Sequence, residues 1–207
     1  MRVDIRAIIM AGGEGVRLRP MTIHCPKPLV PLLGRPVMAY TLQLLKKHNI
    51  SRVGVTLWYQ PKKIRAAFGE GEKEGMKISY FEETEPLGTA GSVRMTREHI
   101  KDTFFVLSGD GLTDCDLTAA LAYHKKKKAL ATLVLKKGAG SPGIRCRDDG
   151  QGWAHHPLCG KTGLEPGVYQ SCQYRHLYSG TGNIFIHSRK RHAGLWKGRI
   201  SFLAGSG

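Results

Sequence analysis

The residues best suited to phosphate chemistry lie close to the start of the chain. Gly12, Gly13 and Gly15 follow a short apolar stretch, and glycines in this place let backbone N–H groups approach a phosphate chain closely. Arg17 follows with a planar guanidinium that can bind two phosphate oxygens at once. Lys27 stands between two prolines, so its cation is expected on a stiff, extended segment that loses little entropy when the cation is positioned. Together these residues predict a site for a phosphate-bearing ligand.

A second candidate for phosphate chemistry is the carboxylate of Asp110. It ends the apolar run TFFVLSGD and has a glycine on each side. A carboxylate at the end of a strand can hold Mg²⁺, which takes few protein ligands and several phosphate oxygens. Asp114 and Asp116 lie nearby, but we expect them to cap the helix that follows. Asp110 is therefore the predicted metal ligand.

The elements that must position these residues alternate between strands and helices. This alternation predicts an α/β fold with a doubly wound, mostly parallel (Rossmann-like) sheet, helices on both faces, and truncation after about the fifth strand. In such sheets ligands bind beyond the carboxyl ends of the strands, where Gly12, Gly88 and Asp110 fall. The expected strands are 7–11, 52–59, 77–81, 103–110 and 129–135, and the expected helices are 36–49, 61–71, 90–98 and 117–128.

The glycine motif would indicate only a turn if it stood alone, but its context is more informative. AGGEGVRLRP is followed by CPKPLVP. A Walker loop would need Gly-Lys-Ser/Thr, and a dinucleotide-binding motif would open a helix directly at the glycines. The combination resembles the nucleoside-triphosphate transferase family that activates sugar 1-phosphates. EPLGTAG resembles that family's base-holding loop, and LSGDG resembles its metal-binding Gly-Asp. ISRVGVTLWYQP, PLGTAGSV and SGDGLTDCDL are similar to bacterial mannose-1-phosphate guanylyltransferases, including those fused to a mutase domain.

This resemblance implies an in-line phosphoryl transfer. The sugar 1-phosphate attacks the α-phosphorus of a nucleoside triphosphate and pyrophosphate leaves, with GTP and mannose 1-phosphate as the expected substrates and Mg²⁺ as the cofactor. The implied catalytic residues are Arg17 for the departing pyrophosphate, Lys27 for phosphate charge in the transition state, and Asp110 for the metal. Val16 replaces the threonine usual in the family, which is expected to weaken one phosphate contact. Nucleotide contacts are expected at Ala11, Gly12, Gly13, Leu87, Gly88 and Thr89, although Thr89 could also serve as a helix cap.

Composition favours a protein of the reducing cytoplasm. No apolar run approaches the length of a membrane span, and MRVDIRAIIMAGG fits a buried strand better than a signal peptide. Five cysteines at irregular spacing give no disulfide framework. The net charge of +16 invites a nucleic-acid interpretation, but no RNA- or DNA-binding motif supports it. We expect neither a nucleic-acid nor a membrane partner; assembly into a homo-oligomer stays open.

Acidic residues nearly vanish after Lys137, where only Asp148, Asp149 and Glu165 remain, and periodicity is lost there too. If the first base of the Gly138 codon is dropped, the codons permit family-like stretches in family order. These are VxxPLEYGV from Gly138, KDGRIIRFVEKPxWSQV from Gln151, VNTGIYILEPEIF from Cys172 and DFGKDVFPF shortly after His192. We therefore expect residues 1–137 to form the nucleotide-binding half of the enzyme. Residues 138–207 are interpreted as an out-of-frame tail, disordered or poorly folded, caused by one extra base near the Lys136 and Lys137 codons.

The sequence also allows other interpretations, of which one concerns a metal site and two concern function. A zinc site from Cys146, Cys159, Cys172, His155, His156 and His176 fits no tight metal-binding spacing. The lysine run 125–128 is interpreted as a solvated helix end. Within enzymes, a thymidylyl- or uridylyltransferase acting on glucose 1-phosphate is the alternative. A non-catalytic regulatory relative that binds a nucleotide sugar is another. As written, the chain is expected to be inactive or nearly so, and poorly soluble.

Overall fold

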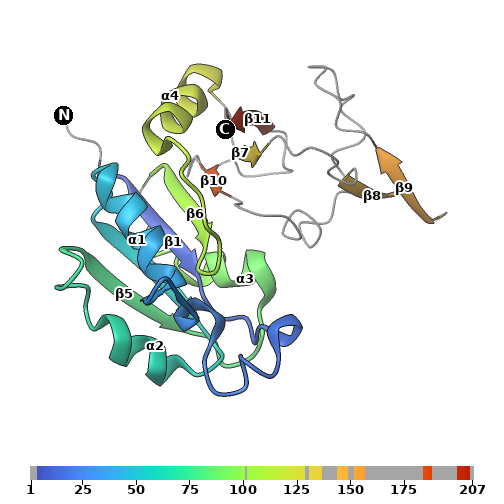
Figure 1. The fold of residues 1–207 in the computed structure, drawn as a ribbon. Helices are drawn as coiled ribbons and strands as arrows, with labels where there is room; N and C mark the ends of the chain where they lie inside the picture. Colours follow the sequence, from blue (N-terminus) through green and yellow to red (C-terminus); the bar gives the residue numbers. More distant parts are fainter. Residues whose placement is uncertain are drawn as a thin grey trace.

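The computed structural model describes residues 4–100, 102–128, 131–136, 144–148, 152–156, 184–187 and 200–205. Its main sheet is built from β1 (Arg6–Met10), β4 (Arg52–Leu57), β5 (Lys77–Glu82), β6 (Phe104–Ser108), β7 (Ala131–Lys136), β10 (Ile184–His187) and β11 (Ile200–Gly205). The strand order is β11-β7-β10-β6-β1-β4-β5 (Figure 1). β10 runs antiparallel to both of its neighbours, whereas every other pairing in the sheet is parallel. The predicted mostly parallel α/β sheet is confirmed.

The five strands predicted from the sequence are present as β1, β4, β5, β6 and β7. The sheet continues beyond the fifth strand, because β10 lies between β6 and β7 and β11 lies outside β7. Both added strands come from the segment interpreted as out of frame. Strand pairing is made by backbone groups, which every reading frame supplies, so the presence of β10 and β11 does not decide the frame.

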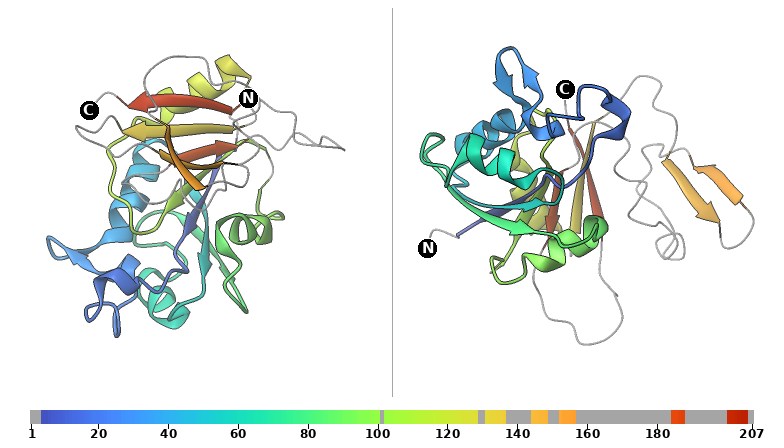
Figure 2. Two further views of the ribbon diagram at one scale, coloured as in Figure 1. Left: turned by 90° about the vertical axis from the view of Figure 1, so that its right-hand side faces the viewer. Right: turned by 90° about the horizontal axis from the view of Figure 1, so that it is seen from below.

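Helices cover both faces of the sheet (Figure 2). They are α1 (Val37–Lys47), α2 (Pro61–Phe68), α3 (Gly88–Met95) and α4 (Leu117–Lys127). Successive β1 residues point to opposite faces. Ala7 and Ile9 join the large core cluster with residues of α1, α2 and α4, whereas Ile8 joins a smaller cluster against which Val93 of α3 packs. This division is the doubly wound arrangement expected from the sequence.

The segment between β1 and α1 departs from expectation. It contains the 3₁₀ turns η1 (Val16–Leu18) and η2 (Lys27–Leu29) and a hairpin of β2 (Pro31–Leu32) and β3 (Arg35–Pro36). The prediction of an extended segment at Lys27 is wrong. Pro28, with its restricted φ, fits a 3₁₀ turn, and the Leu29 N–H donates to the Pro26 carbonyl at 2.8 Å. Lys27 is thus held on a rigid turn.

The start and end of α4 agree with the sequence analysis. Asp116 is its N-cap and accepts a hydrogen bond from the Ala119 N–H at 2.9 Å. The lysines 125–128 at its other end are exposed, as predicted. The buried His124 Nδ1 lies 2.8 Å from Thr132 Oγ1, which ties α4 to β7.

Two other features complete the description. β8 (Ile144–Asp148) and β9 (Gly152–His156) form a separate antiparallel pair. Within the described ranges, none of the helices combines the length and apolar character needed to cross a bilayer. Of the six residues considered for a zinc site, Cys159, Cys172 and His176 lie outside the described residues.

Gly71, in the turn between α2 and β5, offers a test of the packing. Its φ is +94°, and an added Cβ would lie 2.9 Å from the Met76 carbonyl oxygen and 2.8 Å from Ile78 Cγ1. Gly34 has φ +77° but nothing within 4 Å of an added Cβ, so Gly34→Ala carries the backbone strain without the overlap. We expect Gly71→Ala to lower the free energy of unfolding by roughly 1–3 kcal/mol more than Gly34→Ala does, measured by urea denaturation. Equal losses would contradict the described turn.

Candidate functional site

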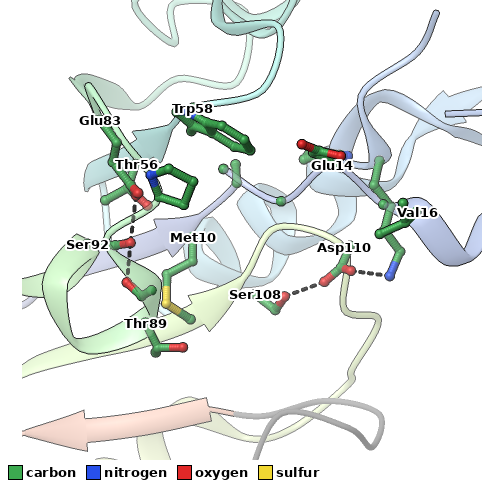
Figure 3. A pocket seen from close by; sticks show the side chains of 18 of the residues that line it. Met10, Glu14, Val16, Thr56, Trp58, Glu83, Thr89, Ser92, Ser108 and Asp110 are labelled. Atoms are coloured by element: carbon green, nitrogen blue, oxygen red, sulfur yellow. Dashed lines mark hydrogen bonds and ion pairs between the residues drawn. The ribbon is translucent and has the colours of Figure 1, made fainter. Parts of the chain in front are cut away.

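Three strands end at one level of the sheet. Met10 at the end of β1 is paired with Thr56 of β4 on one side and with Ser108 of β6 on the other. The loops that follow β1, β4, β5 and β6 line a cavity of about 450 Å³ (Figure 3). This volume suits a small organic ligand. The cavity brings together the predicted site residues Ala11, Gly12, Gly13, Arg17, Lys27, Gly88, Thr89 and Asp110.

Backbone hydrogen bonds fix the glycine loop after β1 to β4 and to the loop that follows β4. The Ala11 N–H donates to the Thr56 carbonyl at 3.0 Å, and the Gly12 carbonyl accepts from the Tyr59 N–H at 3.4 Å. A Cβ at Gly12 would lie 3.3 Å from the backbone nitrogen of Trp58, so a side chain there would crowd the residue that follows β4. Glycine at this position leaves the cavity floor as bare backbone.

The loop then turns sharply at Gly15. Its φ of +66° is the left-handed conformation that favours glycine. Its carbonyl accepts from Thr22 Oγ1 and from the Leu18 N–H, both at 2.9 Å. This turn begins η1, which carries Arg17 to the cavity wall in an exposed position. Arg19 on the same segment pairs with Glu14 at 2.9 Å instead.

Asp110, in the loop after β6, meets two donors. Lys27 Nζ forms an ion pair with Oδ2, and Ser108 Oγ donates to Oδ1 (Figure 3). Burial alone would raise the pKa of Asp110, but the hydrogen bonds from Lys27 and Ser108 outweigh it and lower that pKa below its usual 3.8. The carboxylate is therefore ionised at neutral pH and available to a cation.

The donor set at Asp110 fits a hard divalent cation. One carboxylate beside a hydroxyl offers only oxygen, which Mg²⁺ prefers and softer metals do not. In the part of the chain that the structure describes, no three His, Cys, Asp or Glu side chains gather in a metal-binding group. A cation at Asp110 would thus take most of its ligands from phosphate and water. Asp114 is exposed, and Asp116 is committed to capping α4.

The loop between β5 and α3 is held by Glu83. Its Oε2 accepts from the Leu87 N–H at 3.0 Å, and its Oε1 accepts from Ser92 Oγ at 2.6 Å. Ser92 Oγ also lies 2.6 Å from the Gly88 carbonyl oxygen. Leu87 does not line the cavity and is 40% exposed. The alternative role for Thr89 as helix cap is wrong, because Gly88, with φ +65°, starts α3 one residue earlier.

Three further side chains of the site were not predicted from the sequence: Trp58, Glu83 and Ser108. All three line the cavity. Trp58 and Glu83 directly follow β4 and β5, and Ser108 is the last residue of β6. The rule that ligands bind at the carboxyl ends of parallel strands could have found them, had it been applied to every strand end.

Comparisons with known proteins agree with this geometry. Residues 6–142 match the model of a family described as nucleotidyl transferase. The chain is 38% identical over 144 residues to the UTP–glucose-1-phosphate uridylyltransferase of Synechocystis sp., covering 64% of this chain and 37% of that protein. It is 35% identical over 133 residues to the mannose-1-phosphate guanylyltransferase of Mycobacterium tuberculosis, with the same two coverages. The chain thus spans less than two fifths of the length of these curated relatives.

A solved structure shares the fold. HddC from Yersinia pseudotuberculosis, complexed with GMP-PN, gives a TM-score of 0.63 at 17% sequence identity. The likeness covers 97% of this chain and 90% of that one. At this identity the likeness concerns the fold alone.

The contacts of Asp110 predict a measurable pKa difference. In a Lys27→Met variant the pKa of Asp110 is expected to rise, because the hydrogen bond and charge that stabilise its carboxylate are lost. NMR titration of the side-chain carboxyl would measure it, with Lys125→Met at the exposed end of α4 as the control that leaves it unchanged. Because the folded pKa is lowered, the Asp110 contribution to stability is present above the usual pKa of 3.8 and is lost as pH falls through the lower folded pKa. A wild-type Asp110 that titrates at its usual value would contradict the described contacts.

Proposed function

Because the chain belongs to the nucleotidyl transferase family, we propose that it carries the nucleotide-binding half of an enzyme that makes nucleotide sugars. The proposed reaction transfers a nucleoside monophosphate from a nucleoside triphosphate to a sugar 1-phosphate and releases pyrophosphate. The observation that carries the proposal is the cavity that joins the glycine loop, Arg17, Lys27 and Asp110 at the carboxyl ends of β1, β4 and β6. Cations, bare backbone and a carboxylate suited to Mg²⁺ are what a bound triphosphate requires.

In the proposed reaction a phosphate oxygen of the sugar 1-phosphate bonds to the α-phosphorus as the bond from that phosphorus to the pyrophosphate oxygen breaks. Positioning and charge neutralisation supply most of the catalysis in such transfers. Lys27 stabilises phosphate charge in the transition state, and Arg17 neutralises the departing pyrophosphate. Asp110 holds Mg²⁺, which when bound supplies positive charge to the phosphate oxygens. Gly12 and Gly13 provide backbone against which the phosphates pack.

The proposed substrates are GTP and mannose 1-phosphate. The similarity to the Mycobacterium tuberculosis protein and to further mannose-1-phosphate guanylyltransferases supports this choice. The similarity to the Synechocystis uridylyltransferase keeps UTP and glucose 1-phosphate as the second candidate. A cytoplasmic location, as the irregularly spaced cysteines suggested, is part of the same proposal.

We also propose that residues 138–207 arise from a shifted reading frame. Support comes from the loss of acidic residues after Lys137 and from the four family-like stretches that the codons permit in one shifted frame. The shifted stretch that contains VEKP would then be missing from this chain, and the resemblance implies that its lysine contacts the sugar phosphate.

An activity assay tests the function and the frame together. Pyrophosphate release from GTP and mannose 1-phosphate is expected from the product of a gene with one base removed near the Lys136 and Lys137 codons. The 207-residue chain is expected to show little or none. Turnover by the 207-residue chain would overturn the frame proposal, and an inactive corrected protein that is folded would overturn the function.

Substitution of Lys27 tests its role within that active protein. Lys27→Met is expected to lower kcat by about a hundred- to a thousandfold, because phosphate charge in the transition state loses its cation. Lys125→Met, which removes the same charge far from the cavity, is the matched control. A kcat unchanged by Lys27→Met would exclude this residue from catalysis.

A further inference from the structure

The two cations of the cavity are held in different ways. Arg17 and Lys27 both come from the long loop that leaves β1 and contains the turns η1 and η2. Lys27 is held directly, because its ammonium group pairs with Asp110. Among the residues that the structure describes, no side chain or carbonyl forms a hydrogen bond or ion pair with the Arg17 guanidinium. The position of Arg17 against a ligand therefore depends on the backbone of its loop.

Tyr59, in the loop after β4, contacts that backbone at two points. Its N–H donates to the Gly12 carbonyl at 3.4 Å. Its hydroxyl lies 3.1 Å from the Thr22 carbonyl oxygen and 2.9 Å from that of Ile23. The hydroxyl has one proton to donate, so the two carbonyls share it. One residue thus fixes the loop both where it leaves β1 and where it turns back, and Arg17 lies between these points.

Thr22 extends this contact to the turn that begins η1. It is fully buried, and its Oγ1 donates to the Gly15 carbonyl at 2.9 Å. The same carbonyl accepts from the Leu18 N–H, which closes the turn around Arg17. A Cβ added at Gly15 would lie only 3.0 Å from Thr22 Cγ2, so these two residues are closely packed. A continuous series of contacts therefore connects the Tyr59 hydroxyl with the turn that carries Arg17.

Tyr59 stands on rigid elements and outside the cavity. It is the second residue after β4, which pairs with β1, and it closely precedes α2. The next residue, Gln60, adds a hydrogen bond from Nε2 to the Ile23 carbonyl at 2.8 Å. Trp58 lines the cavity, whereas Tyr59 does not. Tyr59 can therefore affect a ligand only through the loop that it holds.

We propose that Tyr59 is a positioning residue for Arg17, holding the glycine loop so that the guanidinium meets the β- and γ-phosphates of the nucleotide. This inference rests on the proposed function, in which Arg17 neutralises the departing pyrophosphate. Without the hydroxyl the loop has more conformations, and restricting them when the nucleotide binds costs free energy. The hydroxyl therefore acts on phosphate binding without touching a phosphate.

Calorimetric titration of the 207-residue chain with GTP and Mg²⁺ tests the inference. Tyr59→Phe removes only the hydroxyl and should weaken GTP binding by roughly three- to tenfold, the effect of one lost hydrogen bond. Thr22→Val removes the next hydrogen bond but keeps the branched side chain, and it should weaken GTP binding to a similar degree. Tyr80→Phe is the matched control. The Tyr80 hydroxyl donates to the Gly69 carbonyl at 2.7 Å, neither residue lines the cavity, and GTP binding should not change.

A double-mutant cycle distinguishes positioning of Arg17 from a general structural role. Arg17→Met should weaken GTP binding by roughly ten- to a hundredfold, because charged hydrogen bonds to phosphate are lost. If Tyr59 acts through Arg17, Tyr59→Phe should have little further effect in the Arg17→Met background. GMP gives an independent comparison. It lacks the phosphates assigned to Arg17, so Tyr59→Phe should not weaken its binding, whereas a distorted cavity would weaken GMP and GTP alike.

The outcomes separate the inference from the function on which it rests. If the unaltered chain binds no GTP, the proposed function falls and the inference with it. If the unaltered chain binds GTP and Tyr59→Phe binds it equally well, the function stands and the inference is wrong. A loss for GMP as large as that for GTP, or losses that multiply in the double variant, would assign Tyr59 to the general shape of the cavity. Either result would also overturn the inference.

Discussion

The loops that line the cavity follow β1 and three strands whose positions depend on β1. β4 and β6 pair directly with β1, and β5 pairs with β4. Backbone hydrogen bonds place Met10 level with Thr56 and Ser108, and parallel direction makes all three strands end at the same edge. β1 is buried on both faces, with Ala7, Ile8 and Ile9 at 0% exposure. A slip of one residue in this strand would exchange its two faces and move the glycine loop away from the loops beside it. The site therefore inherits its precision from the register of a central strand.

The charges around the cavity follow from this arrangement. Lys27 and Asp110 are 83 positions apart in the sequence, and they meet because η2 and the loop after β6 face each other across the end of β1. Each neutralises the charge of the other in the absence of a ligand. A Mg²⁺-nucleotide would draw Asp110 to the cation and Lys27 to phosphate. One ion pair thus joins the proposed metal ligand, Asp110, to the proposed catalytic cation, Lys27.

The sequence indicated the parts of this molecule that obey periodicity. Apolar spacing predicted the four helices and five strands of the main sheet, namely β1, β4, β5, β6 and β7. Asp110 and Gly12 were predicted as site residues because each follows an apolar run. The 3₁₀ turn at Lys27 escaped prediction because two prolines fit extended and 3₁₀ backbone about equally well. Trp58 escaped because it lies beside Gly12 only through the pairing of β1 with β4. Glu83 escaped because no sequence motif marks the residue that follows β5. The reading frame of residues 138–207 is a property of the DNA, and strand pairing carries no information about it.

The central claim is that Lys27, Asp110 and the glycine loop bind one Mg²⁺-nucleoside triphosphate. A crystal structure of the chain with GTP and Mg²⁺ tests it most directly. The account predicts phosphates against Gly12 and Gly13, Asp110 on the metal, and Lys27 moved from Asp110 to a phosphate oxygen. A nucleotide bound elsewhere, or a cavity nucleotide that leaves the ion pair between Lys27 and Asp110 intact, would contradict it.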